Sequence, residues 1–250
     1  MGSPATPSAV VSLAMYPFAS LRAATDTLWS VARRHLGWGP SALEWDQLPP
    51  AVWYHDDLVL GQACGWPLVT SLADRVAAIG TFDFDVPGGE GGTYQSVIIG
   101  RDSTPLDRIV GGPGVVVAVN AFDSLSGWVS LQHVWGGVPD QVVHTGSHLD
   151  SVRAVVDGHA EVASIDAVSW FHICREEPRL ASALHIIGSG PRVPCLPLVT
   201  SRVDSVAELR DALAAAVADP TARSACDTLR IRTFVPLDNA DYRPVRSLVP

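Results

Sequence analysis

The chain contains no lysine: all 17 of its basic residues are arginine, and 26 acidic residues give it a formal net charge of −9. Without lysine the protein cannot form a Schiff base through a side-chain amine, and it lacks the Walker lysine that contacts nucleotide phosphates. An acidic chain without basic clusters is also a poor candidate for binding nucleic acid or an anionic membrane. We therefore expect neither kind of partner.

Cysteine is scarce as well. The four cysteines show no C-x-x-C pair and no other metal-ligand spacing, so the sequence predicts no zinc site and no other metal. Disulfides and free thiols are both compatible with their scattered positions, which are Cys64, Cys174, Cys195 and Cys226. Long apolar runs are missing too, since no stretch approaches the roughly 20 residues needed to cross a bilayer. No membrane span is predicted.

The N-terminus lacks the basic segment that precedes the apolar stretch of a signal peptide, because residues 1–18 contain no arginine. The protein is expected in the cytoplasm if Met1 is the native start, and outside it if a leader has been removed. Hydrophobic residues make up 47% of the 250 positions. That suffices for a well-buried core, in one large domain or in two smaller lobes.

Strand-like and helix-like segments alternate along the chain. Apolar runs typical of strands cover 9–18, 56–62, 76–84, 93–103 and 114–120, with further ones ending at 166, within 183–201 and near the C-terminus. Helical spacing covers 20–37, about 124–135, 147–157, 167–178 and 205–220, and a helix start is expected after residue 62. This alternation favours an α/β fold with a mostly parallel sheet. In such folds ligands bind beyond the carboxyl ends of the strands.

The stretch "NAFDSLSGW", residues 120–128, lies at one such end. It follows the apolar run "GVVVAVN" and precedes a predicted helix, whose free backbone N–H groups carry a partial positive charge. Ser124 and Ser126 add hydroxyl donors, and Gly127 lets a ligand approach the backbone. These are the ingredients of an oxyanion site without a cationic side chain. A plain helix cap by Asp123 or Ser124 is the alternative.

Two further helix starts carry polar side chains. His148 follows "TGS" at a predicted helix start, where it and Ser147 supply a second set of donors, or serve the structure alone. Asp166 ends the apolar run "VASI", and a buried carboxylate there needs a partner. That partner is either a ligand or the first turn of the following helix.

In the first half of the chain, "GQACGWP" places Gln62, Cys64 and Trp66 at a matching strand end. Cys64 is interpreted as a packed thiol, because no His–Asp pair is present to activate it as a nucleophile. Tyr16 and Tyr94 each lie at a strand boundary, from which a phenol can reach a cleft or pack in the core.

Two glycine-rich stretches do not predict a nucleotide cofactor. "GGPGVVVAV" precedes its strand, whereas a dinucleotide fingerprint follows a strand and opens a helix. "GGEGG" lies between two predicted strands, which indicates a loop or a hairpin. We therefore expect no cofactor.

Several segments together resemble the PhnD-like family, the phosphate-, phosphite- and phosphonate-type substrate-binding proteins of ABC transporters. They are "DDLVLGQACGWPL", "GGTYQSVIIGRDS", "VAVNAFDSLSGW", "GSHLDSVRAVVDGHAEVASIDAVSW" and "PRVPCLPLVTS". The resemblance implies the type 2 periplasmic-binding-protein fold, with two Rossmann-like α/β lobes joined by hinge strands. Lobe 1 would combine residues 1–97 and 201–250, lobe 2 would span 98–200, and hinge bending would close them on a ligand. An ABC permease is the implied partner.

The resemblance also implies roles for particular residues. Positions 124–127 match the serine-rich helix start that grips the oxygens of the anion, and His148 matches a histidine that adds to this grip. Asp166 matches an aspartate that faces the cationic or polar substituent of a phosphonate. The full set of expected ligand-binding residues is Ser124, Leu125, Ser126, Gly127, His148, Asp166, Tyr94, Tyr16, Gln62 and Trp66. Gln95 departs from the pattern, because a basic residue is common at that position.

The sequence thus predicts a protein that binds a small oxyanion without covalent chemistry. Two alternatives remain open: an enzyme on the same fold acting on a different small acid, and a cytosolic ligand sensor.

Overall fold

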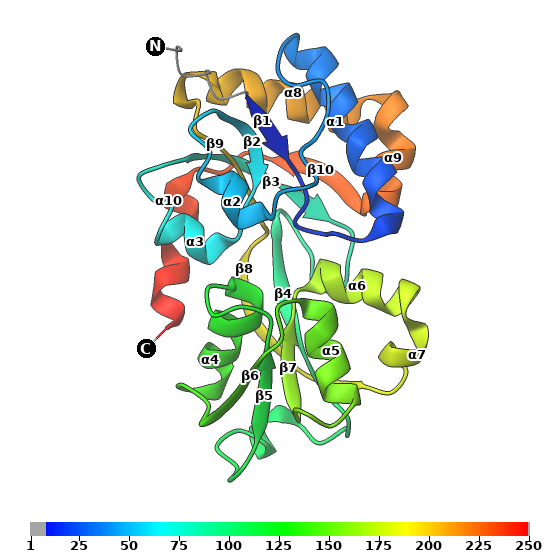
Figure 1. Cartoon of the computed structure of the whole chain (residues 1–250), viewed down its shortest axis with the longest axis vertical. Helices are drawn as coiled ribbons and strands as arrows, with labels where there is room; N and C mark the ends of the chain where they lie inside the picture. Colours follow the sequence, from blue (N-terminus) through cyan, green and yellow to red (C-terminus); the bar gives the residue numbers. More distant parts are fainter. Residues whose placement is uncertain (1–8, 250) are drawn as a thin grey trace, which may run out of the picture. The chain divides into compact units, whose positions relative to one another are not determined.

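The computed structural model describes residues 9–249. The chain divides into two compact units, each with a five-stranded sheet and packed helices (Figure 1). Unit 1 combines the chain up to Asp85 with Cys195–Tyr242, and unit 2 combines Val86–Pro194 with the segment from Arg243. The predicted α/β class is confirmed. The first eight residues, which carry part of the signal-peptide prediction, lie outside the described range.

Unit 1 has its sheet in the order β1-β2-β9-β3-β10, in which β1 and β2 run parallel and the other neighbours antiparallel. The strands are β1 (Val10–Ser12), β2 (Leu58–Gln62), β3 (Ala77–Phe84), β9 (Pro197–Thr200) and β10 (Ile231–Val235). The helices are α1 (Arg22–Leu36), α2 (Pro49–Trp53), α3 (Gly65–Val69), α8 (Val206–Ala218), α9 (Arg223–Leu229) and α10 (Asn239–Tyr242), with 3-10 turns η1 (Ala19–Leu21), η4 (Val203–Ser205) and η5 (Pro220–Ala222).

The longest helix of unit 1, α1, follows from its sequence pattern. Leu28 and Val31 lie on its buried face, and α1 packs against α8 and α9. Gly37 ends it in the left-handed conformation, with φ of 81° and its N–H donated to the carbonyl of Arg33. The predicted strand 9–18 is shorter in the structure, because Ser12 pairs with Gly61 and the partner strand β2 ends one residue later.

Unit 2 has its sheet in the order β6-β5-β7-β4-β8, in which β6, β5 and β7 run parallel while β4 runs antiparallel to β7 and β8. The strands are β4 (Thr93–Gly100), β5 (Val116–Val119), β6 (Gln141–His144), β7 (Val162–Ile165) and β8 (His185–Pro194). The helices are α4 (Ser130–Trp135), α5 (His148–Val156), α6 (Ala167–Glu176) and α7 (Pro178–Ala181), with the turns η2 (Leu106–Arg108), η3 (Leu125–Val129) and η6 (Arg243–Leu248). Its core includes Ile98, Val117, Leu131 and Val162.

The expectation of a mostly parallel sheet is wrong. Antiparallel neighbours outnumber parallel ones in both sheets taken together. Every antiparallel pair contains one of the strands β3, β4, β8 and β9, which border the two links that carry the chain from one sheet to the other without a helix. These strands therefore do not enter their sheets through the helical crossovers that produce parallel pairs. The glycine-rich link between β3 and β4 is a loop and not a hairpin, because its two strands belong to different sheets.

The limits of the two units differ from the predicted lobe limits. The units divide after Asp85 and before Cys195, whereas the sequence placed the divisions at 97/98 and 200/201. β4 pairs with β7 and β8 from Thr93 onward, and β9 pairs with β2 and β3. Each of these strands therefore lies whole in one sheet.

Two further expectations concern covalent links and membranes. The sequence left disulfides and free thiols open as alternatives. In the structure all four cysteines are free thiols. Among the helices of residues 9–249, none is long and apolar enough to cross a bilayer.

Candidate functional site

Three parallel strands of unit 2 end at one edge of the sheet, and each leads into a helix (Figure 1). The central strand β5 leads into η3 and α4, β6 leads into α5, and β7 leads into α6. The carboxyl ends of neighbouring parallel strands lie side by side, so three helix N-termini come together there. Their partial positive charges favour an anion.

The helix start after β5 is wider than an ordinary α-helical turn. The backbone N–H groups of Trp128 and Val129 both donate to the carbonyl of Ser124, at 3.0 Å each, so η3 is a π-helical turn. The Oγ of Ser124 accepts the N–H of Gly127 at 3.0 Å. Ser124 is therefore the N-cap of this helix, and Asp123, the other candidate, is exposed.

The hydroxyl of Ser126 is the centre of the polar cluster. It lies 3.0 Å from Nε2 of His148, the first residue of α5, and 3.4 Å from the hydroxyl of Ser124. The carbonyl of Ser126 accepts a hydrogen bond of 2.5 Å from Ser164 on β7. Side chains from all three strand ends thus fix this serine, which is 4% exposed.

The imidazole of His148 is neutral at neutral pH. Burial lowers its pKa below the ordinary value, while the negative charge of Asp166 acts in the opposite direction. Its Nδ1 is sealed from solvent and has no hydrogen-bond partner among the described residues. The hydrogen bond to Ser126 thus involves Nε2 alone.

Two of the predicted polar residues serve as helix caps. The hydroxyl of Ser147 accepts the N–H of Asp150 at 3.0 Å and donates to its carboxylate at 2.7 Å, so it is not the free donor expected beside His148. Asp166, which is 2% exposed, accepts the N–H of Ser169 at 2.8 Å through Oδ1. The capping alternative given for Asp166 therefore holds, and Ser147 is a helix cap as well.

Gly127 is required by the packing of its neighbourhood. A Cβ atom at this position would overlap Oδ1 of Asn120, the residue that follows β5. The sequence suggested that this glycine makes room for a ligand, but the space beside its Cα holds the Asn120 carboxamide. Asn120 was not predicted as a site residue, because the contact joins positions seven residues apart across a strand end.

The remaining predicted residues are divided between the two units. Tyr94 lies on β4 of unit 2 and is 1% exposed. Tyr16, Gln62 and Trp66 belong to unit 1, where the ring of Tyr16 packs edge-on against Phe84 at 5.8 Å. Hydrogen bonds join Ser124, Ser126 and His148 within unit 2.

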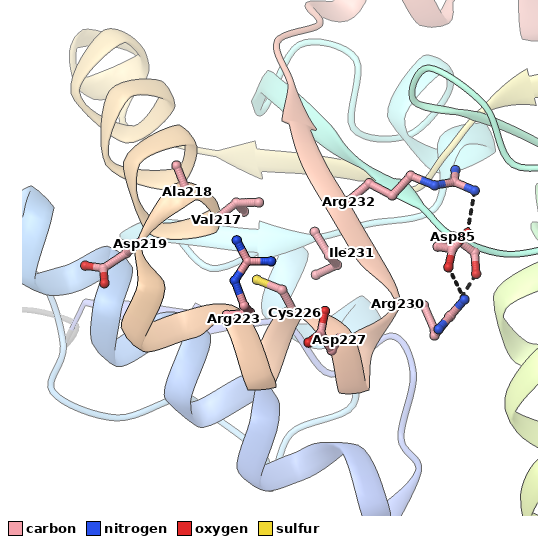
Figure 2. A pocket seen from close by; sticks show the side chains of 10 residues that line it. All are labelled: Asp85, Val217, Ala218, Asp219, Arg223, Cys226, Asp227, Arg230, Ile231 and Arg232. Carbon is pink, nitrogen blue, oxygen red and sulfur yellow. Dashed lines mark hydrogen bonds and ion pairs between the residues drawn. The ribbon is translucent and has the colours of Figure 1, made fainter.

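A cavity of about 430 Å³ lies elsewhere, within unit 1, between α8, α9 and β10 (Figure 2). Of its three arginines, Arg230 and Arg232 both bind Asp85, and Arg232 also lies 3.5 Å from a carboxylate oxygen of Asp83. None of the predicted site residues lines this cavity.

Residues 66–242 match the family model described as "ABC transporter, phosphonate, periplasmic substrate-binding protein". The matched range includes positions 124–127, His148 and Asp166, whereas Tyr16 and Gln62 lie before it. The resemblance found in the sequence is confirmed by this match. No curated protein matches the sequence significantly.

Solved structures support the same fold. A binding protein component of an ABC phosphonate transporter from Pseudomonas aeruginosa superposes with a TM-score of 0.74 and 14% identity, over 91% of this chain and 80% of that one. PhnD1 from Prochlorococcus marinus, in complex with methylphosphonate, gives 0.74 and 13% over 92% of each chain. A Xanthomonas citri protein bound to chloride ion gives 0.70 and 16% over 97% and 96%. The predicted type 2 periplasmic-binding-protein fold is confirmed.

Proposed function

Because the chain belongs to the family of phosphonate ABC transporter periplasmic substrate-binding proteins, we propose that it captures a small phosphorus oxyanion of the phosphonate, phosphite or phosphate type. The captured anion is handed to an ABC permease, the partner that membership of this family implies. Methylphosphonate, the ligand of the Prochlorococcus marinus protein, is the probe of choice.

The observation that carries this proposal is the cluster of uncharged donors at the three strand ends of unit 2. Ser124 and Ser126 offer hydroxyl groups, His148 offers a neutral imidazole, and the helix starts offer backbone N–H groups. Such donors stabilise an anion by hydrogen bonds and dipoles, so the site needs no cationic side chain. We assign the grip on the oxygens to residues 124–127 and His148.

The other predicted residues take the remainder of the ligand in this proposal. Asp166 and Tyr94 face the organic substituent, and Tyr16, Gln62 and Trp66 of unit 1 complete the site when the lobes close by hinge bending. Selectivity among phosphonates then depends on this second set, because the grip on oxygen atoms is common to all of them.

Binding without turnover is favoured over catalysis by the surroundings of His148. Ser126 and His148 lie at the distance of a nucleophile and its general base. A catalytic triad also needs a carboxylate that holds the other ring nitrogen. Nδ1 of His148 has no such partner in the described part of the chain, and the Oδ1 of Asp166 is occupied as a helix cap.

The test is the substitution Ser126→Ala with methylphosphonate as ligand. Loss of a hydrogen bond to a charged group should weaken binding by roughly 1–3 kcal/mol, measured by isothermal titration calorimetry. Ser182→Ala is the matched control, since this exposed serine of the same unit uses its hydroxyl to bond the carbonyl of Arg179, a local contact at the end of α7. Unchanged affinity in Ser126→Ala would place the anion elsewhere.

A further inference from the structure

Asn120 is the residue that follows the central strand β5, directly before the helix start of the candidate site. Its side-chain oxygen Oδ1 is sealed from solvent and accepts no hydrogen bond from any described residue. The same oxygen occupies the place that a Cβ of residue 127 would take. The carboxamide is therefore clamped between the strand end and Gly127.

The close contact between the Asn120 carboxamide and the Cα of Gly127 favours one of the two orientations of the amide, with the oxygen toward Gly127. A buried oxygen without a donor costs about 1–3 kcal/mol, although the adjacent Cα–H of Gly127 offsets part of this cost. The reverse orientation would bury two unpaired N–H donors against the same Cα, which is less favourable. In the structure the amide oxygen is the atom that is buried without a hydrogen bond, and the amide nitrogen is not.

We propose that the amide nitrogen of Asn120 donates a hydrogen bond to the bound oxyanion, and that Gly127 holds the amide in the orientation that allows it. The inference rests on the proposed function, since it adds one donor to the same site. Asn120 follows the middle strand of three, and its Oδ1 and the hydroxyl oxygen of Ser124 both lie beside the Cα of Gly127. An anion held without a cationic side chain needs every neutral donor that the site can supply.

The decisive variant is Asn120→Asp, which keeps the shape of the side chain and replaces both N–H donors by a carboxylate. At about pH 7.5 this carboxylate is charged and repels the ligand, so we expect methylphosphonate binding to weaken at least about tenfold relative to wild type. At about pH 5 the group begins to protonate and regains an O–H donor. The ratio of the two affinities should then move back toward one.

The ratio at each pH removes only those pH effects that wild type and variant share, and inorganic sulfate, whose charge is the same at both pH values, serves as a second probe ligand. Gln141→Glu is the matched control: it adds the same charge to an exposed residue at the amino end of β6, away from the strand ends of the site. Its affinity should stay within about twofold of wild type at both pH values. Melting temperatures without ligand report whether each variant is folded, and Asn120→Ser replaces Asn120→Asp if the latter is not.

The results separate the two proposals. If Ser126→Ala weakens binding but Asn120→Asp does not, Asn120 is no ligand donor and the proposed function stands. A loss in Asn120→Asp that low pH does not relieve would show a distorted helix start, which also overturns the donor role. If wild type binds neither methylphosphonate nor inorganic phosphate, the proposed function fails and this inference fails with it.

Discussion

His148 and its hydrogen-bonded neighbour Ser126 show how the candidate site treats charge. The ring is kept neutral by burial, although the carboxylate of Asp166 pulls its pKa upward. The site therefore contains no permanent cation, and its attraction for an anion depends on dipoles of fixed direction. This arrangement has a consequence for stability that can be measured without any ligand.

Folding stability should fall as the pH drops below about 6.5, and His148 should cause part of the fall. Above that value the histidine is neutral in both states and contributes nothing. Between its lowered folded pKa and its unfolded pKa, only the unfolded chain binds the proton, which favours unfolding. Denaturant unfolding at about pH 7.5 and 5.5 checks this.

The comparison is with His148→Gln, in which the other titrating groups remain and cancel. Wild type should lose more stability between the two pH values than the variant does. Equal losses would mean that the ring is as free to protonate in the folded protein as in the unfolded chain.

At the scale of elements, local signals predicted the four longest helices, α1, α5, α6 and α8, but missed the shorter helices α2 and α9. Gly37 ends α1, Ser147 caps α5 and Pro178 follows α6, and each signal acts within a few residues of the helix it limits. Strand pairing was not predictable in this way, because it joins distant segments, and the mostly parallel sheet was wrong for that reason. The short strand β6 was missed, since two of its four residues are exposed and its run "QVVH" is brief.

The same distinction applies to the candidate site. The sequence could place Ser124 and Ser126 at a strand end and His148 at a helix start, because strand ends and helix starts are local features. It could not show that Asn120 fills the space beside Gly127, because a steric contact between two backbone turns exists only in three dimensions.

The strand β3 offers a test of such a contact in unit 1. Gly80 has φ of 154°, and a Cβ there would overlap the ring of Phe234 and the carbonyl of Val235 on β10. Gly80→Ala should lower the free energy of unfolding by roughly 1–3 kcal/mol, through strain and displaced packing. Chemical denaturation monitored by circular dichroism measures this.

Gly61→Ala is the control for a strand glycine of the same sheet. A Cβ at this position would meet the flexible end of the Leu58 side chain, and Gly61 does not have a positive φ. We therefore expect a smaller decrease in the free energy of unfolding. If Gly80→Ala is no more destabilising than Gly61→Ala, β10 can move away from the added methyl group at little cost, and the argument from close packing is wrong.

For the whole molecule, the resemblance read from dispersed segments identified the family and the fold, although no single motif was decisive. The sequence predicted two lobes but not the residues at which the two units divide, because those limits depend on which sheet each strand joins. A ligand that binds only the folded protein must raise its melting temperature. This links the proposed function to a property of the entire chain.

Methylphosphonate, phosphite and phosphate should each raise the melting temperature, whereas a dicarboxylate such as malate should not. A ligand at about one hundred times its dissociation constant adds about 2.7 kcal/mol to the stability of the state it binds. Differential scanning fluorimetry against such a panel is the measurement. A shift with malate and none with the phosphorus oxyanions would contradict the phosphonate assignment and favour a different small acid.

The hydrogen bond from Ser164 to the carbonyl of Ser126 ties the proposed anion-binding turn to the adjacent strand β7 before any ligand arrives. The turn is therefore ordered during folding and not during binding, so little conformational entropy remains to be lost when the anion enters. Association should then be governed by diffusion and by dehydration of the anion. Dissociation becomes the step at which one phosphonate is distinguished from another.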